Sequence, residues 1–449
     1  MKKRIISAIV VTMVITSLIA GCSSKVEGIS KTNDEPTKIT FWHGMSDNLG
    51  TSLDKLVKDF NDTHKDIVVT AQYQGEYDDA LNKLKSAQTN NSGPDVMQCY
   101  DIGTKYMIDS KAIVPIQNFV DKEKYDILSL EENLLAYYTV DNKLYSMPFN
   151  SSTPILLYNK NAFKEAGLDP NTPPKSLAEV EDMAKKLTKK DASGKVTQYG
   201  YSMAIYGWFF EQFMLKQEKD YANNANGRSG NATAVDYEKN GGGLTLLNEW
   251  KKLVESGDVG NFGRKTADTR NAFIAENSAV YIDSTSSLSS VLKGVNGKFE
   301  VGTGYMPSVS NSDKGGVSIG GASLWIMDNK DEKKQQASWE FIKFLVSADQ
   351  QAYWNVNTGY FPVTKKAYDT QMVKDNLAKY PQFQTAVDQL HASTPKSAGA
   401  LFGVFPEARA AIETNIENML NGKQTQEQAL ENAAKTTNIA IEKYNKTNK

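Results

Sequence analysis

Short apolar runs and amphipathic segments alternate in the first hundred residues of this chain. Three runs rich in β-branched and aromatic residues have the character of strands: 39–42, 67–70 and 95–100. Between the first two, apolar residues recur at i, i+3, i+4 and i+7, which predicts one face of a helix: Leu53, Leu56, Val57 and Phe60. Residues 78–88 form a second helical segment. Strands separated by helices favour a parallel sheet, because parallel neighbours need a crossover connection.

The same alternation continues along the chain. Ser176 and Glu179 form a capping-box signature, which predicts a helix start just before Leu177. Residues 279–282 predict a strand that leads through Ser284 into a helix. After Trp325 the sequence favours helices, at 332–346, 348–355, 382–391, 406–420 and 425–444.

The N-terminus has the pattern of an export signal. Three basic residues precede an apolar stretch over 5–20 that is too short for a stable membrane anchor. Small residues stand immediately before Cys22, as in the lipobox of bacterial lipoproteins. We therefore expect residues 1–21 to be a signal peptide, Cys22 to carry the lipid, and 22–37 to form a flexible tether. The alternatives are an ordinary secretory signal or an uncleaved anchor.

Length, cysteine content and charge limit the class of protein. A chain of 449 residues normally divides into two domains, so two lobes are expected within 38–449. With Cys22 lipidated, Cys99 has no partner, and a disulfide framework is not expected. The net charge of −2 becomes −5 when Lys2, Lys3 and Arg4 leave with the signal, which makes nucleic acid an unfavourable partner.

Signatures of catalysis are missing from the sequence. The three histidines, His43, His64 and His391, lie far apart without cysteines or paired carboxylates at metal-ligand spacing. No nucleophile elbow, phosphate loop or metalloprotease motif occurs. We expect no catalytic residues, metal or cofactor, although a carboxylate pair suited to hydrolysis can assemble without a linear trace.

Ser284 stands at the corner where a predicted strand meets a predicted helix. Free backbone N–H groups and the helix dipole favour an anion at such a corner, and serine hydroxyls add donors. Simple N-capping explains the same serines, and on the local sequence alone it is the favoured interpretation.

Five short blocks of this sequence stand together as a pattern: Phe41-Trp42-His43, Tyr100-Asp101-Ile102-Gly103-Thr104, 148–154 (Pro-Phe-Asn-Ser-Ser-Thr-Pro), 320–325 (Gly-Gly-Ala-Ser-Leu-Trp) and 358–362 (Thr-Gly-Tyr-Phe-Pro). In these blocks the chain resembles the extracellular solute-binding proteins of sugar-type ABC importers, most narrowly those that bind glycerol 3-phosphate. The resemblance implies a two-lobed, type II-like periplasmic-binding-protein fold. Each lobe is a mostly parallel sheet flanked by helices, and the ligand lies in the cleft. We expect lobe 1 at about 38–150 plus 285–345, and lobe 2 at about 151–284 plus 346–449.

The resemblance also implies the residues of the site. The phosphate end would be held by Ser152, Ser284, Gly321, Tyr360 and Arg409, and the glycerol end by Tyr77, Asp101 and Trp208. A guanidinium meets two phosphate oxygens with parallel hydrogen bonds, which suits Arg409 to this role. Two positions depart from the pattern: Asp101 replaces a glutamate, and Ile205 replaces the first tryptophan of a pair. A reshaped glycerol pocket with room for a larger head group is therefore expected.

The expected function is that of a monomeric, lipid-anchored receptor on the extracytoplasmic face of the cell membrane. It would capture glycerol 3-phosphate or a glycerophosphodiester and deliver it to an ABC permease heterodimer driven by cytosolic ATPases. A receptor for a neutral mono- or oligosaccharide is the alternative among binding proteins. A secreted phosphodiesterase or glycosidase is the alternative among enzymes.

Overall fold

The computed structural model describes residues 35–90, 92–394 and 398–448. The expected signal segment 1–21 and Cys22 lie outside these residues, as does the tether up to residue 34. Thr37, expected in the tether, already begins the first strand. From Pro36 onwards the chain forms one compact unit, whose described residues contain two large β-sheets and two small two-stranded ones.

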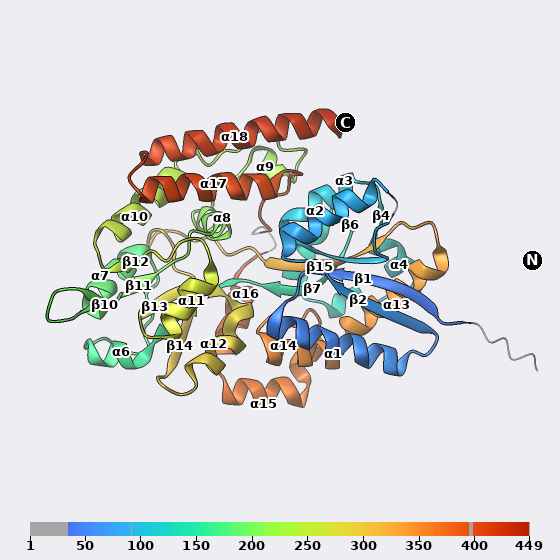
Figure 1. Ribbon diagram of the computed structural model, residues 1–449, viewed down its shortest axis with the longest axis horizontal. Coiled ribbons are helices and arrows are strands. Elements are labelled where there is room, and N and C mark those ends of the chain that lie inside the picture. The colour runs from blue at the N-terminus through green and yellow to red at the C-terminus, as the bar shows by residue number, and fades with distance from the viewer. Residues whose placement is uncertain (1–34, 91, 395–397, 449) are drawn as a thin grey trace, which may run out of the picture. The chain divides into compact units, whose positions relative to one another are not determined.

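The first sheet holds the predicted strands at 39–42, 67–70 and 95–100 (Figure 1). Its members in the described part of the chain are β1 (Thr37–His43), β2 (Ile67–Tyr73), β3 (Val96–Tyr100), β4 (Ile113–Val114), β7 (Met147–Ser152) and β15 (Gly320–Met327). The order is β2-β1-β3-β15-β4, with β7 also paired to β15. β1 is parallel to β2 and to β3, which confirms the parallel arrangement, whereas β15 is antiparallel to β3, β4 and β7.

The second sheet has the same plan. Its strands are β8 (Pro154–Asn159), β11 (Tyr201–Ser202), β12 (Val259–Gly260), β13 (Val280–Ser284) and β14 (Val301–Tyr305). The order is β12-β11-β13-β8-β14. β11 is parallel to β12 and β13, and β8 is antiparallel to both of its neighbours, β13 and β14. Each sheet is therefore mostly parallel with one reversed strand.

The chain crosses between the sheets at the reversed strands. β7 leads directly into β8 with Thr153 alone between them, and the chain returns between β14 and β15. This gives two α/β lobes joined by crossover strands, as expected. The expected lobe boundaries need one correction: β14 pairs with β8 over Val301–Tyr305, so this part of 285–345 belongs to the second sheet and not to lobe 1.

Helices follow most strands and cover the sheets. Those before the first crossing are α1 (Asp47–Thr63), α2 (Tyr77–Gln88), α3 (Thr104–Asp109), α4 (Ile116–Glu123) and α5 (Glu132–Tyr138). Those between the crossings are α6 (Lys160–Glu165), α7 (Leu177–Leu187), α8 (Gly207–Lys216), α9 (Asn223–Gly227), α10 (Gly242–Glu255), α11 (Thr266–Ile274) and α12 (Leu288–Val295). The rest are α13 (Glu332–Leu345), α14 (Ala348–Thr358), α15 (Gln371–Lys379), α16 (Gln382–Ala392), α17 (Phe405–Leu420) and α18 (Gln426–Thr447).

The predicted apolar face of α1 is the face that packs. All four periodic residues are buried, and Phe60 at the end of the stripe is fully enclosed. Its ring meets Phe341 and Phe344 of α13 edge-on, with centroids 5.1 and 5.3 Å away. Aromatic pairs favour this geometry, so α1 and α13 are held together on one side of the first sheet.

The capping signature at Ser176 is realised in part. The Ser176 hydroxyl accepts a hydrogen bond from the Glu179 backbone N–H, which caps α7 as predicted. The Glu179 carboxylate accepts from the backbone N–H of Lys175 instead of that of Ser176. A complete capping box opens α18, at Thr425 and Gln428.

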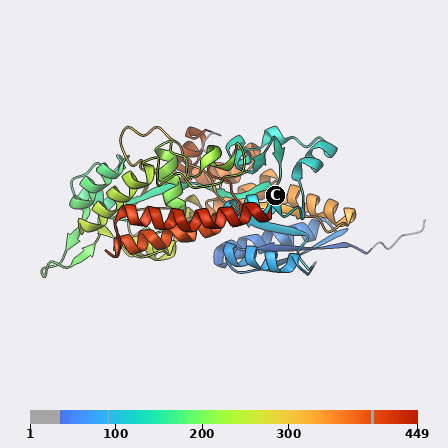
Figure 2. The ribbon, with the colours of Figure 1, turned by 90° about the horizontal axis from the view of Figure 1, so that it is seen from above.

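The two C-terminal helices position one wall of the site. Figure 2 shows α17 and α18 lying side by side, and α17 also packs against α8 of the second lobe. α17 passes close to the short turn of 3-10 helix that follows β3, at Asp101–Gly103. Residues far apart in the sequence, on α8, α17 and this turn, therefore come together.

Candidate functional site

A cavity of about 850 Å³ lies between elements of the two sheets. Its lining includes the ends of β3, β7, β13 and β15, the first turn of α2, the starts of α8 and α11, and one face of α17. All eight residues expected to bind ligand line it: Tyr77, Asp101, Ser152, Trp208, Ser284, Gly321, Tyr360 and Arg409. Sequence positions up to 332 residues apart are thus gathered at one cavity, and what each does there remains a prediction.

Ser152 and Gly321 lie where the first sheet meets the cavity. Ser152 is the last residue of β7 and pairs with Gly320 at the start of β15. Gly321 has a φ of +98°, and a Cβ added there would lie 1.9 Å from the carbonyl oxygen of Asn150. Only glycine fits this close approach, so the backbone of β15 reaches the cavity edge without a side chain in front of it.

Gly359 and Tyr360 bring the end of α14 to the same place. Gly359 ends the helix in the left-handed conformation with φ +113°, and a Cβ there would lie 2.2 Å from the Thr285 carbonyl oxygen. This close approach sets Tyr360 beside the turn that begins at Ser284. The Tyr360 ring stacks on Trp354, with centroids 5.8 Å apart and planes 7° from parallel.

Ser284 ends β13 and caps the following 3-10 turn, Thr285–Ser287. Its hydroxyl oxygen accepts hydrogen bonds from the backbone N–H of Ser286 at 3.2 Å and from the Ser286 hydroxyl at 2.8 Å. The N-capping interpretation is therefore confirmed. The hydroxyl proton of Ser284 remains free to be donated, so capping and anion binding are compatible at this residue.

Arg409 lies in a buried carboxylate cluster. Its Nε and Nη2 each donate to a carboxylate oxygen of Glu211 at 2.8 Å, and Nη2 lies 3.7 Å from Asp101 Oδ2. Burial raises the pKa of Asp101 to about 7, against the opposing effect of the Arg409 guanidinium. One of the two guanidinium edges that can meet a pair of phosphate oxygens, the Nε–Nη2 edge, is thus already occupied by Glu211. Bidentate capture of phosphate by that edge would require this ion pair to open.

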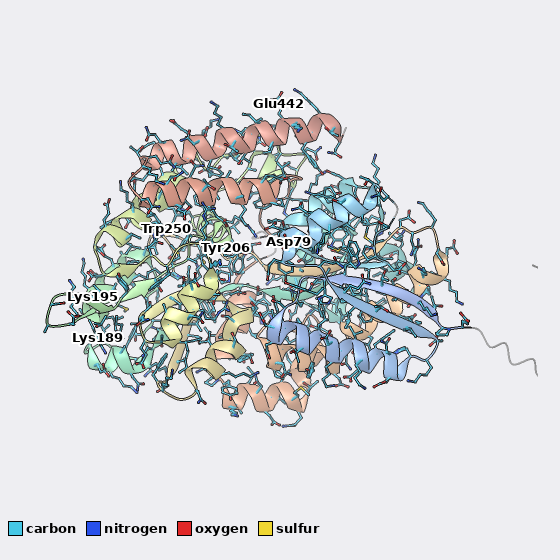
Figure 3. The ribbon with its side chains drawn as sticks, viewed as in Figure 1. Asp79, Lys189, Lys195, Tyr206, Trp250 and Glu442 are labelled. Atoms are coloured by element: carbon cyan, nitrogen blue, oxygen red, sulfur yellow. The ribbon has the colours of Figure 1, made fainter. Side chains whose placement is uncertain are left out.

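Glu211 was not among the residues expected from the sequence. It lies on α8 in an otherwise almost wholly apolar stretch, and its side chain is buried. A lone carboxylate within an apolar helical run is a signal of a buried ion pair, because an unpaired charge there would be strongly unfavourable. Tyr206, labelled in Figure 3, is the loop residue immediately before α8. Its ring centroid lies 5.6 Å from the guanidinium carbon of Arg409.

The glycerol side of the expected site is aromatic. Tyr77, at the first turn of α2, has its ring centroid 5.4 Å from that of Tyr100. Trp208 is buried with its indole against Gly320, where a Cβ would lie 2.6 Å from the ring. Among the described residues, the Trp208 indole N–H has no hydrogen-bond partner. An apolar wall with an unused donor suits a polyol that presents both carbon and oxygen.

The cavity wall also carries cations that the sequence did not single out. Arg270 pairs with Asp283 at 2.8 Å, directly beside Ser284, and Arg264 pairs with Glu417 at 2.7 Å. Lys265 also belongs to the lining. The wall near α11 therefore carries three cations, two of which are already paired with carboxylates, on the side of the cavity where the Ser284 hydroxyl lies.

The histidines and the cysteine have other surroundings. Burial lowers the pKa of His43 to about 4, and burial raises the pKa of the Cys99 thiol. His391 faces Glu131 at 3.3 Å. Within residues 35–90, 92–394 and 398–448, no three His, Cys, Asp or Glu residues are grouped as a metal site would need. None of the helices in these ranges has the length and apolarity needed to span a bilayer.

The sequence matches the family of bacterial extracellular solute-binding proteins over residues 55–385. The chain belongs to this family, whose members capture substrates for ABC import and are binding proteins, not enzymes. It is 34% identical to the sn-glycerol-3-phosphate-binding periplasmic protein UgpB of Escherichia coli K12 over 426 residues, 92% of this chain and 94% of that protein. The UgpB of Yersinia enterocolitica is 33% identical over 425 residues, with the same shares covered.

Solved structures share the fold. UgpB from Mycobacterium tuberculosis, in complex with glycerophosphocholine, superposes with a TM-score of 0.77 at 21% identity, covering 91% of this chain and 99% of that chain. The GacH receptor of Streptomyces glaucescens gives a TM-score of 0.73 at 20% identity, covering 91% and 99%. At these identities the likeness establishes the two-lobed fold.

Proposed function

We propose that this chain captures glycerol 3-phosphate or a glycerophosphodiester outside the cytoplasmic membrane and delivers it to an ABC importer. The observation that carries the proposal is the convergence of all eight expected ligand residues on one cavity. The identity to glycerol-3-phosphate-binding proteins along nearly the whole chain supports the same ligand class.

The phosphate would bind among donors that come from both lobes. Ser152 and the backbone of Gly321 belong to the first sheet, and Ser284 ends a strand of the second. Lys265 lines the cavity on the same side, and Arg264 and Arg270 lie there as partners of Glu417 and Asp283. A ligand that contacts both lobes stabilises the conformation in which they approach each other, because only there are all contacts made.

A neutral saccharide is the second candidate, and one observation favours it. Arg409 donates its Nε–Nη2 edge to Glu211, so the most deeply buried cation of the cavity is already neutralised. A sugar receptor would use Tyr77, Trp208 and Tyr360 for packing and leave this ion pair closed.

The head-group end of the cavity would accept more than glycerol. Asp101 is one methylene shorter than the glutamate of the resembling proteins, and Ile205 replaces a tryptophan. Ile205 is buried and is not part of the cavity lining. A glycerophosphodiester would place its second alcohol on this side, whereas the phosphate would stay near Ser152 and Ser284.

The same proposal covers the membrane anchor, the transport partner and the oligomeric state of the protein. Cys22 would carry the lipid that anchors the chain at the extracytoplasmic face, and the partner would be a permease heterodimer with cytosolic ATPases. The protein would act as a monomer and would not turn its ligand over. Hydrolysis of glycerophosphocholine or maltose during prolonged incubation at high protein concentration would establish the phosphodiesterase or glycosidase alternative instead.

Thermal unfolding of the purified protein against a ligand panel tests the proposal. The panel is glycerol 3-phosphate, glycerophosphocholine, glycerol, inorganic phosphate, maltose and glucose. A ligand at 100 times its Kd stabilises the native state by about 2.7 kcal/mol. We expect stabilisation by the first two alone. Stabilisation by maltose or glucose, with none from either phosphate ester, would favour the saccharide receptor.

A further inference from the structure

A buried series of hydrogen bonds connects the loop after β1 to the phenol of Tyr77. The backbone N–H of Gly44 donates to Gln98 Oε1 at 2.9 Å, and Gln98 Nε2 donates to Asn150 Oδ1 at 2.8 Å. Asn150 Nδ2 then donates to the phenol oxygen of Tyr77 at 2.8 Å. The side chains of Gln98 and Asn150 are completely buried on β3 and β7, so water does not compete for these bonds.

The direction of this series is fixed at its first member. A backbone N–H can only donate, so the amide of Gln98 must turn its oxygen towards Gly44 and its nitrogen towards Asn150. Asn150 must then present its oxygen to Gln98 and its nitrogen to Tyr77. The phenol oxygen of Tyr77 is therefore an acceptor towards Asn150, and its proton must be given to another group.

We propose that Gln98 and Asn150 are positioning residues that hold the Tyr77 phenol as a hydrogen-bond donor to the ligand, which must present an acceptor oxygen there. The proposal rests on the proposed function and deepens it. A ligand oxygen that only accepts, such as a phosphate or ester oxygen, satisfies this donor without restriction. A hydroxyl, including the glycerol hydroxyls expected on the Tyr77 side, satisfies it only if its own proton is donated elsewhere.

The second phenol of the cavity does not change this outcome. Burial, and next to it the neighbouring Tyr360, hold the pKa of Tyr77 well above its ordinary value, so Tyr77 keeps its proton at neutral pH. If Tyr77 gives that proton to the Tyr360 oxygen, the Tyr360 proton is in turn directed away from Tyr77. In both cases the pair of phenols offers a donor to the cavity, which both residues line.

Reversing the series with one substitution tests the proposal. In Gln98→Glu, studied at a pH above the pKa of the new carboxyl, which burial raises, the carboxylate accepts from Gly44 and also needs a donor from Asn150. The Asn150 amide must therefore turn over, and its oxygen then takes the Tyr77 proton. We expect Gln98→Glu and Tyr77→Phe each to weaken binding of glycerol 3-phosphate about tenfold or more, as measured by calorimetry. The double variant should bind no more weakly than Gln98→Glu alone, because Tyr77 no longer donates.

A matched control separates this effect from a buried charge. Gln351 is also completely buried, with Oε1 accepting from Val363 N–H and Nε2 donating to the Leu345 carbonyl, outside the cavity. Because that carbonyl cannot donate, Gln351→Glu should lower the Tm more than Gln98→Glu and leave the Kd unchanged. Two outcomes would overturn the proposal. One is a Kd unaffected by Gln98→Glu at a pH at which the new carboxyl is ionised, and the other is a double variant whose loss of affinity equals the product of the two single losses.

The same cycle distinguishes failure of this inference from failure of the proposed function. If the unmodified protein binds maltose or glucose and neither phosphate ester, the proposed ligand class is wrong. The cycle is then measured with that sugar. If the double variant binds that sugar no more weakly than Gln98→Glu alone, the directed series of hydrogen bonds is still supported. If the affinity losses of the two single variants multiply in the double variant, the series is refuted.

Discussion

Replacing Glu211 by Gln removes the charge that holds Arg409 while keeping the shape of the side chain. The Gln oxygen can accept one of the two 2.8 Å hydrogen bonds, but its amino group then faces a guanidinium N–H, donor against donor. Breaking a buried ion pair destabilises by about 3–5 kcal/mol, because the remaining charge is left uncompensated. For the folded unit Pro36–Lys449 this corresponds to a fall in Tm of about 3–6 °C.

Calorimetric unfolding with and without ligand measures this prediction. Glu417→Gln is the matched control, since it breaks the Arg264–Glu417 pair, whose side chains are 35% and 40% exposed, and should destabilise by less than about 1 kcal/mol. With Glu211 neutralised, Arg409 is free to meet an anion. Glycerol 3-phosphate should therefore stabilise Glu211→Gln more than the unmodified protein. A Tm within 1 °C of the unmodified protein (~1 kcal/mol) would refute the buried-pair reasoning.

Three further results are expected. Gly321→Ala should lower the free energy of unfolding by several kcal/mol, because its Cβ would meet the Asn150 carbonyl. Gly194→Ala, also at positive φ but with open space around it, should lower it by about 1 kcal/mol. Urea unfolding measures both values. Because the pKa of Asp101 is raised in the folded state, its contribution to stability is present below pH ~4 and is lost as pH rises to about 7. Asp101→Asn should therefore flatten the dependence of Tm on pH between these values. An unchanged slope would contradict this expectation. Ser284→Ala should weaken glycerol 3-phosphate binding about tenfold in calorimetric titration, whereas Thr370→Ala, which removes the cap of α15 outside the cavity, should leave the Kd unchanged.

The local architecture of the first lobe was predictable because its signals are local. The periodic residues of α1 and the runs of β1, β2 and β3 lie close together in the sequence, and the parallel pairing follows from their order. The resemblance supplied the eight residues that line the cavity. Their convergence depends on every passage of the chain between the lobes, including the one after β15 that brings α16 against β14 and α17 against α8, and no local pattern displays these passages.

The strands of the return crossing show why the rest was not predictable. β14 contains Gly302 and Gly304, which weaken a strand pattern, yet a Cβ at 302 would lie 2.2 Å from the Tyr158 ring on the neighbouring strand. β15 begins with two glycines and pairs with strands more than 150 residues earlier in the sequence. Their placement is decided by partners distant in the chain, and for this reason the lobe boundary near 301–305 was wrong.

Glu211 was missed for a related reason. Its partner is 198 residues away on α17, so the sequence shows only an acidic residue within an apolar helix. The Arg409 position was predicted, but the electrostatic state of its side chain depends on which carboxylates fold against it. Charge in a cavity is a property of the assembled cluster and cannot be assigned one residue at a time.

β7 continues into β8 with Thr153 alone between them, so Ser152, which is proposed to contact the ligand, lies next to the point where the chain passes from the first sheet to the second. Thr153 is held by Thr285, whose backbone N–H donates to its carbonyl, and by Gln389, which donates to its hydroxyl, and Ser152 immediately precedes it. A new side chain at 152 would therefore alter both affinity and the connection between the sheets. Substitutions at Asp101 or around Trp208, which lie on neither crossing strand, are expected to change ligand specificity without changing the connection between the sheets. The departures at Asp101 and Ile205 fall in those two regions, so the ligand range of such a receptor can diverge while its moving parts stay the same.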